Sequence, residues 1–140
     1  MALKTYSGSC HCGAVRFEAD IDLSAGSNRC NCSVCTKARA WFLIVKPEHY
    51  RPTAGEDKLS EYQWTPAGRS DSFLHYRFCQ TCGIRTAGHG GLDSKEGGFY
   101  FVSVASLDNV DPDELAAMPV RYADGKHDRF DRAPADTQVL

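Results

Sequence analysis

Three cysteines lie within six residues in the segment Cys30-Asn31-Cys32-Ser33-Val34-Cys35. A cysteine pair stands on each side of this segment, as Cys10-His11-Cys12-Gly13 before it and Cys79-Gln80-Thr81-Cys82-Gly83 after it. The three groups together contain all seven cysteines of the chain. Seven cysteines cannot all form disulfides, and clustered cysteines in a reducing compartment more often bind metal or carry out redox chemistry. We therefore expect the cysteines to bind metal and to organise the fold.

Length and composition indicate an ordinary globular chain. We expect one domain over residues 1–140, because this length suits one domain with a modest core. Sixteen basic and eighteen acidic side chains are interspersed, which argues against a nucleic-acid or membrane surface as the main partner. The chain contains no apolar run as long as the roughly 18 residues of a transmembrane helix, and its start lacks the apolar stretch of a secretion signal. These features predict a cytoplasmic protein.

Hydrophobic patterns predict a chain built mainly of β-strands. Val15, Phe17 and Ala19 alternate with charged residues, which is typical of a half-buried strand. Residues 41–45 form a continuous apolar run and are interpreted as a buried strand. A hairpin is predicted from residues 59–65 and 72–78, around Pro66-Ala67-Gly68. Further strands are expected at residues 3–6, 84–87, 99–104 and 120–122, a helical turn at 36–40, and a helix at 111–118 with Asp111 as its N-cap.

Four segments are interpreted as turns or loops from their glycine, proline and polar content. They are residues 7–9, 24–28, 51–57 and 88–98. The last segment is rich in glycine and is a candidate lid over a bound substrate. The polar tail from about residue 124 carries little signal.

The outer cysteine pairs have the spacing of two zinc knuckles. Cys79 and Cys82 are two residues apart with glycine behind them, and Cys10 and Cys12 supply the other half. Zinc accepts four thiolates tetrahedrally at about 2.3 Å, and such sites are closed and structural. The alternative is a pair of unrelated motifs, one of them thioredoxin-like, although a redox motif usually precedes a helix.

The central segment predicts a second kind of metal site. Cys30, Cys32 and Cys35 can converge on one metal and leave a position for water or substrate, as catalytic zinc sites do. A zinc held by three thiolates suits a soft ligand, above all a substrate thiolate. Lys37 and Asn31 are candidates for binding that ligand, Lys37 through a carboxylate and Asn31 through hydrogen bonds. Each also has a plainer interpretation, as a solvated lysine and as a residue that satisfies the turn.

A histidine could instead complete and close the central site. The histidines available are His11, His49, His75, His89 and His127. None of them stands at knuckle spacing from Cys35. His75 and His89 are candidates for a general acid or base by residue type alone.

The motifs together resemble those of a known family. They are Gly8-x-Cys10-x-Cys12-Gly13-x-Val15-x-Phe17, Cys30-x-Cys32-x-x-Cys35-x-Lys37 and Phe78-Cys79-x-x-Cys82-Gly83. This set resembles the glutathione-dependent formaldehyde-activating enzyme (GFA) family, which includes centromere protein V-like proteins. The resemblance implies a mainly β fold of small coiled antiparallel sheets, the β-tent, stapled by a four-cysteine zinc site. It also implies two zinc ions per chain, a structural one on Cys10, Cys12, Cys79 and Cys82 and a catalytic one on Cys30, Cys32 and Cys35.

Three functional hypotheses follow. The leading one is a zinc-dependent carbon–sulfur lyase that acts on a thiol adduct, with glutathione as the expected thiol partner and S-hydroxymethylglutathione as the example that the resemblance implies. The second is a non-catalytic binding module organised by zinc. The third is a thiol-based redox or metal sensor, because an open three-thiolate site is accessible to oxidants.

Overall fold

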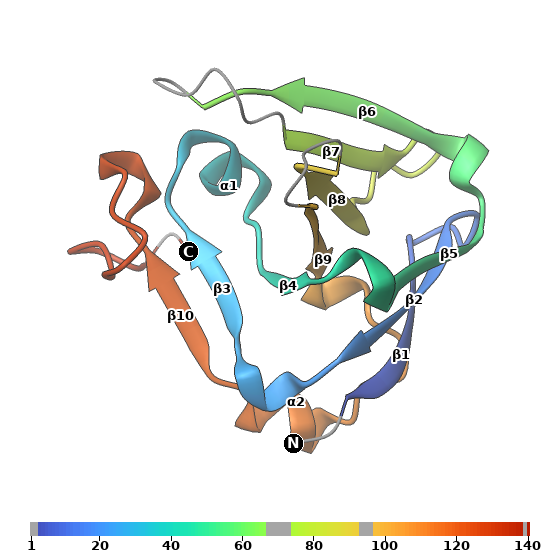
Figure 1. The fold of residues 1–140 in the computed structure, drawn as a ribbon, viewed down its shortest axis with the longest axis horizontal. Helices are drawn as coiled ribbons and strands as arrows, with labels where there is room; N and C mark the ends of the chain where they lie inside the picture. Colours follow the sequence, from blue (N-terminus) through green and yellow to red (C-terminus); the bar gives the residue numbers. More distant parts are fainter. Residues whose placement is uncertain (1–2, 67–73, 93–96, 139) are drawn as a thin grey trace.

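Two β-sheets make up most of the molecule in the computed structural model, which describes residues 3–66, 74–92, 97–138 and 140 (Figure 1). The smaller sheet has the strand order β1 (Lys4–Ser9), β2 (Arg16–Ile21) and β5 (Tyr50–Ala54). The larger sheet has the order β10 (Val120–Ala123), β3 (Ser27–Cys30), β4 (Phe42–Val45), β9 (Phe99–Ser103), β8 (Ala87–Gly90), β7 (Leu74–Cys79) and β6 (Leu59–Trp64). Two short helices accompany these strands within the described residues, α1 (Ser33–Ala38) and α2 (Pro112–Ala117).

The expected mainly β fold is confirmed, with one difference in strand direction. Every neighbouring pair is antiparallel except β10 and β3, which run parallel. In Figure 1, β1, β2 and β5 lie on one side of the molecule and β10 and β3 on the other. Within the described residues, neither helix has the length and hydrophobicity needed to cross a membrane.

The hydrophobic core contains side chains from both sheets. From β2 it takes Phe17 and Ala19, as their alternation predicts, and from β4 it takes Leu43 and Val45. The interpretation of β4 as fully buried is wrong, because Ile44 is 52% exposed. Side chains alternate between the two faces of a strand, so β4 buries one face in the core and turns the other towards a pocket.

The turn expected at residues 7–9 is instead part of β1. Gly8 pairs with Phe17 across the first two strands. A Cβ atom at Gly8 would lie 2.3 Å from Cζ of Phe17, so the aromatic ring rests directly on the glycine. The glycine therefore permits close packing inside a strand, which a sequence pattern does not distinguish from a turn.

The polar region expected at residues 51–57 is mostly the edge strand β5. Its Arg51 guanidinium donates two hydrogen bonds to Asp20 of β2, both at 3.0 Å. An edge strand faces solvent and tolerates proline, so the polar side chains and Pro52 are compatible with a strand here. Tyr50, the first residue of β5, stacks between Phe17 and Tyr100 at ring-centroid distances of 5.5 and 4.2 Å.

The predicted hairpin is confirmed as β6 and β7, paired from Leu59↔Cys79 to Trp64↔Leu74. Its expected turn residues Ala67 and Gly68 lie outside the described residues.

The strand expected at residues 84–87 begins three residues later, as β8. Gly88 and Gly90 are therefore strand residues and not parts of a lid. A Cβ at Gly88 would lie 2.3 Å from the Phe101 ring and 2.4 Å from the His75 carbonyl oxygen. These glycines make room for an aromatic ring on the sheet. The rest of the expected loop includes residues 93–96, which lie outside the described residues.

The C-terminal elements follow the prediction up to the tail. Asp111 caps α2 by accepting a hydrogen bond from the backbone N–H of Asp113 at 3.1 Å. Strand β10 comes next, with the bounds given above. The segment expected at residues 24–28 to be loop contains a 3-10 turn, Leu23–Ala25, and the start of β3.

Candidate metal centres and the adjoining pocket

The outer cysteine pairs come together at one end of the molecule. Cys10 and Cys12 lie in the turn between β1 and β2, while Cys79 ends β7 and Cys82 follows in the next turn. The four Sγ atoms all lie within 4.8 Å of one another, with Cys10–Cys12 and Cys12–Cys79 separations of 3.6 Å. Zinc–sulfur bonds of about 2.3 Å give a tetrahedral edge of about 3.8 Å. The thiols are therefore spaced to hold a tetrahedral zinc ion.

The two halves of this cluster use backbone turns of different length, and a glycine N–H closes each of them. The N–H of Gly13 donates to the Cys10 carbonyl oxygen at 3.2 Å, and the N–H of Gly83 donates to that of Cys79 at 2.8 Å. Each glycine has a positive φ, +80° and +76°, which L side chains disfavour. Their position directly behind the second cysteine is the feature that the sequence indicated.

Backbone amides face the sulfurs of the cluster and favour thiolate. The amides of Val15 and Thr81 donate to the sulfurs of Cys10 and Cys79, at 3.3 and 3.4 Å. Hydrogen bonds from the amides of Cys82 and Thr81 lower the pKa of Cys79. Bonds from the amides of Cys12 and Ile84 lower the pKa of Cys82 to about 6. Zinc binds the thiolate form, so this environment fits the ion.

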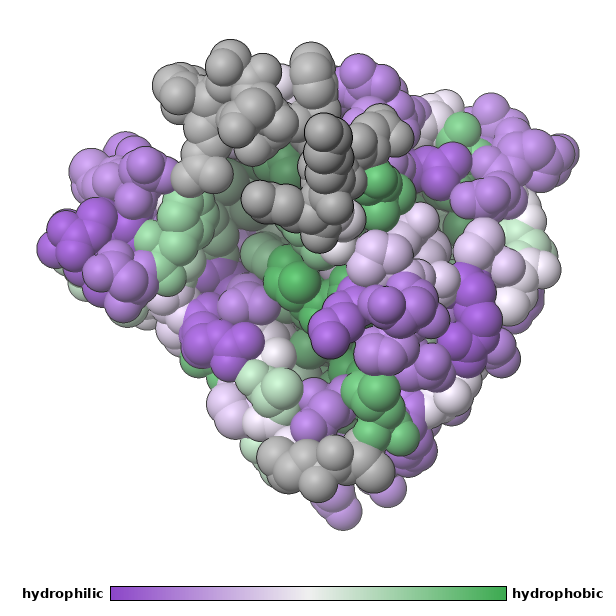
Figure 2. All heavy atoms as spheres, viewed as in Figure 1, coloured by the Kyte–Doolittle hydropathy of each residue, from purple (hydrophilic) through white to green (hydrophobic). Residues whose placement is uncertain are grey.

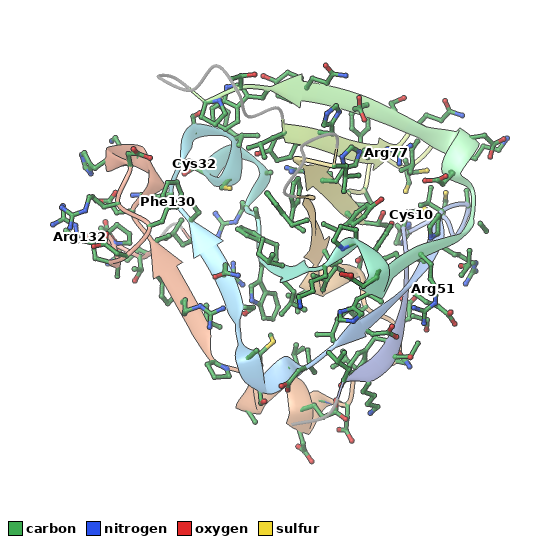
Figure 3. All side chains as sticks on the ribbon, in the orientation of Figure 1. Cys10, Cys32, Arg51, Arg77, Phe130 and Arg132 are labelled. Carbon is green, nitrogen blue, oxygen red and sulfur yellow. The ribbon has the colours of Figure 1, made fainter. Side chains whose placement is uncertain are left out.

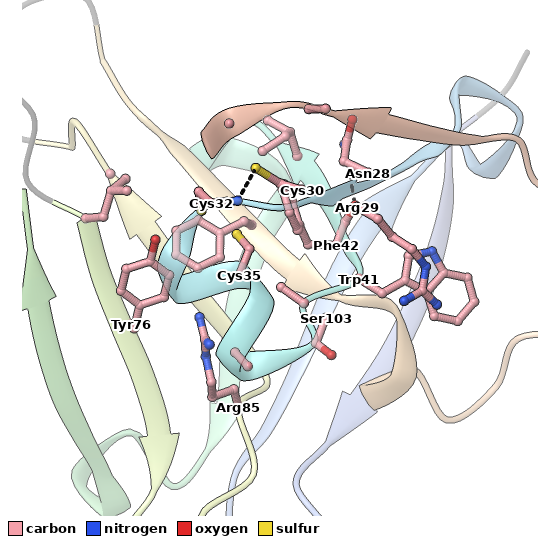
Figure 4. A pocket seen from close by; sticks show the side chains of 18 of the residues that line it. Asn28, Arg29, Cys30, Cys32, Cys35, Trp41, Phe42, Tyr76, Arg85 and Ser103 are labelled. Atoms are coloured by element: carbon pink, nitrogen blue, oxygen red, sulfur yellow. Dashed lines mark hydrogen bonds between the residues drawn. The ribbon is translucent and has the colours of Figure 1, made fainter. Parts of the chain in front are cut away.

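The central cysteines form a second cluster at the start of α1. Cys30 ends β3, Cys32 is the N-cap of α1, and Cys35 lies in its first turn. Their Sγ atoms also lie within 4.8 Å of one another, and the Cys32 amide donates to the Cys30 sulfur at 3.4 Å (dashed in Figure 4). Within the described residues, which include all five histidines, no further histidine, cysteine or carboxylate joins this group. The cluster thus offers a metal three thiols.

The pKa values of the central thiols are shifted in opposite directions. Hydrogen bonds donated by the Cys32 and Cys35 thiols lower the pKa of Cys30 to about 3. The same interaction with Cys30 raises the pKa of Cys35, and burial adds to the effect. The cluster therefore holds a thiolate at neutral pH, the form that binds a metal ion.

A pocket of about 1570 Å³ opens beside this second cluster. Its walls include Cys30, Cys32 and Cys35 together with aromatic side chains of the larger sheet, among them Phe42 and Tyr76 (Figure 4). Figure 2 shows apolar side chains gathered in the middle of this face, over β4. Pockets of small-molecule sites are commonly about 300–1,000 Å³, so this one is large enough for a peptide-sized ligand.

Four basic side chains line the pocket, namely Arg29, Arg39, Arg85 and Lys126, and Arg85 is the one that lies over the Tyr76 ring. The Arg85 guanidinium carbon lies 4.5 Å from the centre of the Tyr76 ring, and both residues line the pocket. Burial lowers the pKa of Arg85, although arginine remains protonated in proteins. Burial raises the pKa of Tyr76, which keeps its hydroxyl neutral. The pair therefore presents a fixed positive charge and a hydroxyl group to a ligand.

The sequence of the chain matches that of a known protein family. Residues 5–123 match the family described as glutathione-dependent formaldehyde-activating enzyme. The chain belongs to this family. Its fold is also similar to the crystal structure of a Rhodobacter sphaeroides protein, with 32% sequence identity and a TM-score of 0.61. That similarity covers 81% of this chain and 98% of the other.

Membership of the GFA family supports a glutathione-related function and a catalytic role. The matched residues contain all seven cysteines, which are free thiols in the structure. The resemblance seen in the sequence motifs is thus confirmed at the level of the family. Residues from 124 onwards lie outside the match.

The tail from residue 124 covers the second cluster, although its sequence was interpreted as carrying little signal. Asp124 is only 5% exposed and accepts a hydrogen bond from the Asn31 side-chain amide at 2.9 Å. The Lys126 backbone N–H donates to the amide oxygen of Asn31 at 2.9 Å. A Cβ at Gly125 would lie 2.5 Å from the Cys30 sulfur. The tail therefore packs directly against the cysteine cluster.

The tail also brings a histidine to the pocket. His127 lines the pocket, and its Nδ1 lies 2.8 Å from a carboxylate oxygen of Asp124. Hydrogen bonds from Asn31 and then from His127 lower the pKa of Asp124, so the carboxylate is ionised. Sequence reasoning placed no weight on this pair. The Asp124-Gly125 dipeptide, which begins two residues after the strand predicted at residues 120–122, is a turn signal that could have indicated a specific structure there.

The other sequence candidates lie away from the pocket wall. Lys37 is exposed on α1 and is not among the residues that line the pocket. The Asn31 amide makes its hydrogen bonds with the tail. His75 and His89 lie on β7 and β8 with their side chains on the sheet face opposite the pocket, because alternate residues, Leu74, Tyr76 and Gly90, line it.

Proposed function

We propose that this protein is a zinc-dependent carbon–sulfur lyase that cleaves and forms a glutathione adduct such as S-hydroxymethylglutathione. The observation that carries the proposal is a group of three thiols, within the described residues, on the wall of a peptide-sized pocket. The family to which the chain belongs supplies glutathione and formaldehyde as the candidate substrates.

Two groups of residues would hold metal. Cys10, Cys12, Cys79 and Cys82 would bind a structural zinc ion, because four thiols close its coordination shell. Cys30, Cys32 and Cys35 would bind a second zinc ion. That ion would keep one position open, where it would stabilise the thiolate form of glutathione.

His127 is the proposed general base for the cleavage direction. Asp124 accepts a hydrogen bond from Nδ1 and so orients the ring, which leaves Nε2 with its lone pair. Nε2 takes the proton of the adduct hydroxyl as the carbonyl of formaldehyde forms. The carbon–sulfur bond breaks, and its electron pair stays on the glutathione sulfur. In the reverse direction the same nitrogen returns the proton to the oxygen.

Arg85 is the proposed anchor for a carboxylate of glutathione. It is a protonated side chain on the pocket wall that burial partly shields from water, and a charge-assisted hydrogen bond is stronger there than in bulk water. The Tyr76 ring holds the guanidinium in place. Asn31 is proposed to act indirectly, because its amide fastens the tail that carries His127. Lys37 does not line the pocket, and its proposed role is limited to that of an exposed cation on α1.

Exchange spectroscopy on an equilibrium mixture of glutathione and formaldehyde tests this function. The zinc-loaded protein is expected to accelerate interconversion of free and hydroxymethylated glutathione above the uncatalysed rate. Arg85→Ala should raise KM about tenfold or more and Arg85→Lys less, because lysine keeps the charge but loses the two-pronged geometry. Equal exchange rates with and without the zinc-loaded protein, for glutathione and for other small thiols, would leave only a zinc-organised binding module.

A further inference from the structure

A third group of metal-ligating side chains lies outside both cysteine clusters. It consists of Glu61, His75 and His89. These residues come from β6, β7 and β8, which are consecutive neighbours at one end of the larger sheet. His75 and His89 are directly paired across β7 and β8, and Glu61 is diagonal to His75 across β6 and β7. Directly paired and diagonal side chains on one face of a sheet are within reach of each other.

The ligand atoms of the group are close together. Nδ1 of His75 lies 3.1 Å from Oε2 of Glu61. The two imidazole rings stack at a centroid distance of 4.5 Å with 17° between their planes. One ligand atom from each residue can be chosen so that all three lie within 4.8 Å of one another. The three strands thus bring two imidazole rings and a carboxylate close enough together to face one ion.

Two histidines and one carboxylate are a recurrent ligand set for first-row divalent metals. Metal–ligand bonds of about 2.0–2.2 Å place neighbouring ligand atoms about 3.3–3.6 Å apart in a tetrahedron. The three ligand atoms lie within 4.8 Å of one another, so rotation of the side chains is enough to bring them to this spacing. His75 and His89 are only half-buried, which leaves room for that rotation.

We propose that Glu61, His75 and His89 bind a divalent first-row transition-metal ion such as Zn²⁺ or Ni²⁺. The site would fasten the edge strand β6 to β7 and β8. It is independent of the proposed lyase reaction, because its side chains lie on the sheet face opposite the pocket.

The surroundings support a charged carboxylate ligand. Gln63 donates a hydrogen bond to Glu61 at 2.9 Å, and this bond together with His75 lowers the pKa of Glu61. Arg77 lies beside the other oxygen of Glu61, with Nε 3.9 Å away, and also forms an ion pair with Glu56 at 3.2 Å. Two carboxylates therefore face one arginine, which leaves negative charge available to a bound cation.

Calorimetric titration of untagged, zinc-loaded protein with Ni²⁺ tests the site. The wild type is expected to bind one Ni²⁺ per chain. His75→Gln, His89→Gln and Glu61→Gln should each weaken that binding at least tenfold, since each removes a ligand. His49→Gln and His127→Gln are matched controls outside the group and should bind Ni²⁺ as the wild type does.

A second measurement keeps the test decisive if one histidine variant folds poorly. Ni²⁺ should raise the thermal unfolding midpoint of the wild type, because it binds the folded state. At the same Ni²⁺ concentration the rise should be smaller for Glu61→Gln, whose substitution lies on an exposed position of an edge strand. Absence of Ni²⁺ binding by the wild type, or equal binding by the wild type and the three ligand variants, would overturn the proposal and leave a Glu61–His75 ion pair only.

Discussion

The two cysteine clusters use the same local chemistry in different surroundings. In both, a backbone amide donates to a cysteine sulfur, at 3.3–3.4 Å. The four-cysteine cluster joins the β1–β2 turn to the end of β7, packs against Val15, and none of its cysteines lines the pocket. In Figure 3, Cys10 lies near this junction, and Cys32 lies on the other side of the molecule at the start of α1. All three cysteines of the second cluster do line the pocket.

This difference teaches that ligand count and surroundings together separate a structural centre from a reactive one. Four thiols complete a tetrahedral zinc ion, whereas three leave a position open. The open position is useful only where a cavity adjoins it, and the larger sheet, α1 and the tail supply that cavity. Substitutions at the two centres test this division.

Cys79→Ser and Cys32→Ser should have opposite consequences. Structural zinc contributes on the order of 10–16 kcal/mol of apparent binding free energy in small peptides. A typical domain is stable by only about 5–15 kcal/mol, so Cys79→Ser is expected to leave little folded protein. Cys32→Ser should leave a folded chain that binds one zinc ion fewer and has no activity. Circular dichroism and metal analysis measure the two effects, and equal unfolding of both variants would contradict the division.

His127→Gln should affect only the second centre. General acid–base catalysis contributes about 10²–10⁴-fold, so kcat for adduct cleavage is expected to fall by at least 100-fold. Zinc content and the unfolding midpoint should match the wild type, because the side chain is 65% exposed. Unchanged kcat would show that the Asp124–His127 pair has no part in the reaction.

Gly125→Ala should disturb the contact between the tail and the second cluster. The new Cβ would lie 2.5 Å from the Cys30 sulfur, so the tail must move away from the cysteines. We expect the affinity of the second cluster for zinc to fall about tenfold, a magnitude typical of a lost supporting contact around the ligands. Competition with a coloured zinc chelator measures this affinity. The first zinc ion is the internal reference, and its affinity should not change.

Asp20→Asn should have the smallest effect and should touch only the sheet that carries Cys10 and Cys12. Hydrogen bonds from Arg51 lower the pKa of Asp20 to about 2. The Asp20 carboxylate binds a proton more tightly in the unfolded chain than in the folded protein, so its ionised form stabilises the fold. This stabilisation is complete above about pH 4 and is lost as the pH falls towards 2. In urea unfolding, wild type and variant should differ at pH 7 and converge near pH 2. A difference that is independent of pH would exclude this ion pair as its cause.

Patterns with a local physical cause were predictable from the sequence. The alternation of Val15, Phe17 and Ala19 gave β2, because a strand turns successive side chains to opposite faces. The Asp111 cap of α2 was predictable because its hydrogen bond closes within two residues. The membership of all seven cysteines in two groups followed from spacing and glycine placement, which a knuckle turn requires.

The errors share one cause, which is that a residue's role depended on a partner distant in sequence. Gly8 and Gly88 were interpreted as loop residues because a sequence does not show the aromatic rings of Phe17 and Phe101 resting on them. The strand β5 was missed because an edge strand, paired on one side, keeps polar side chains.

The identity and grouping of the cysteine ligands follow from the sequence, because thiols two or three residues apart can reach one ion with little help from the rest of the chain. The surroundings of each group come from the tertiary structure. It brought Asp124 and His127 to the second cluster from more than 90 positions along the chain, and it converged Glu61, His75 and His89 from three separate strands. Contacts of that range arise from the packing and register of the whole sheet, which no local spacing specifies.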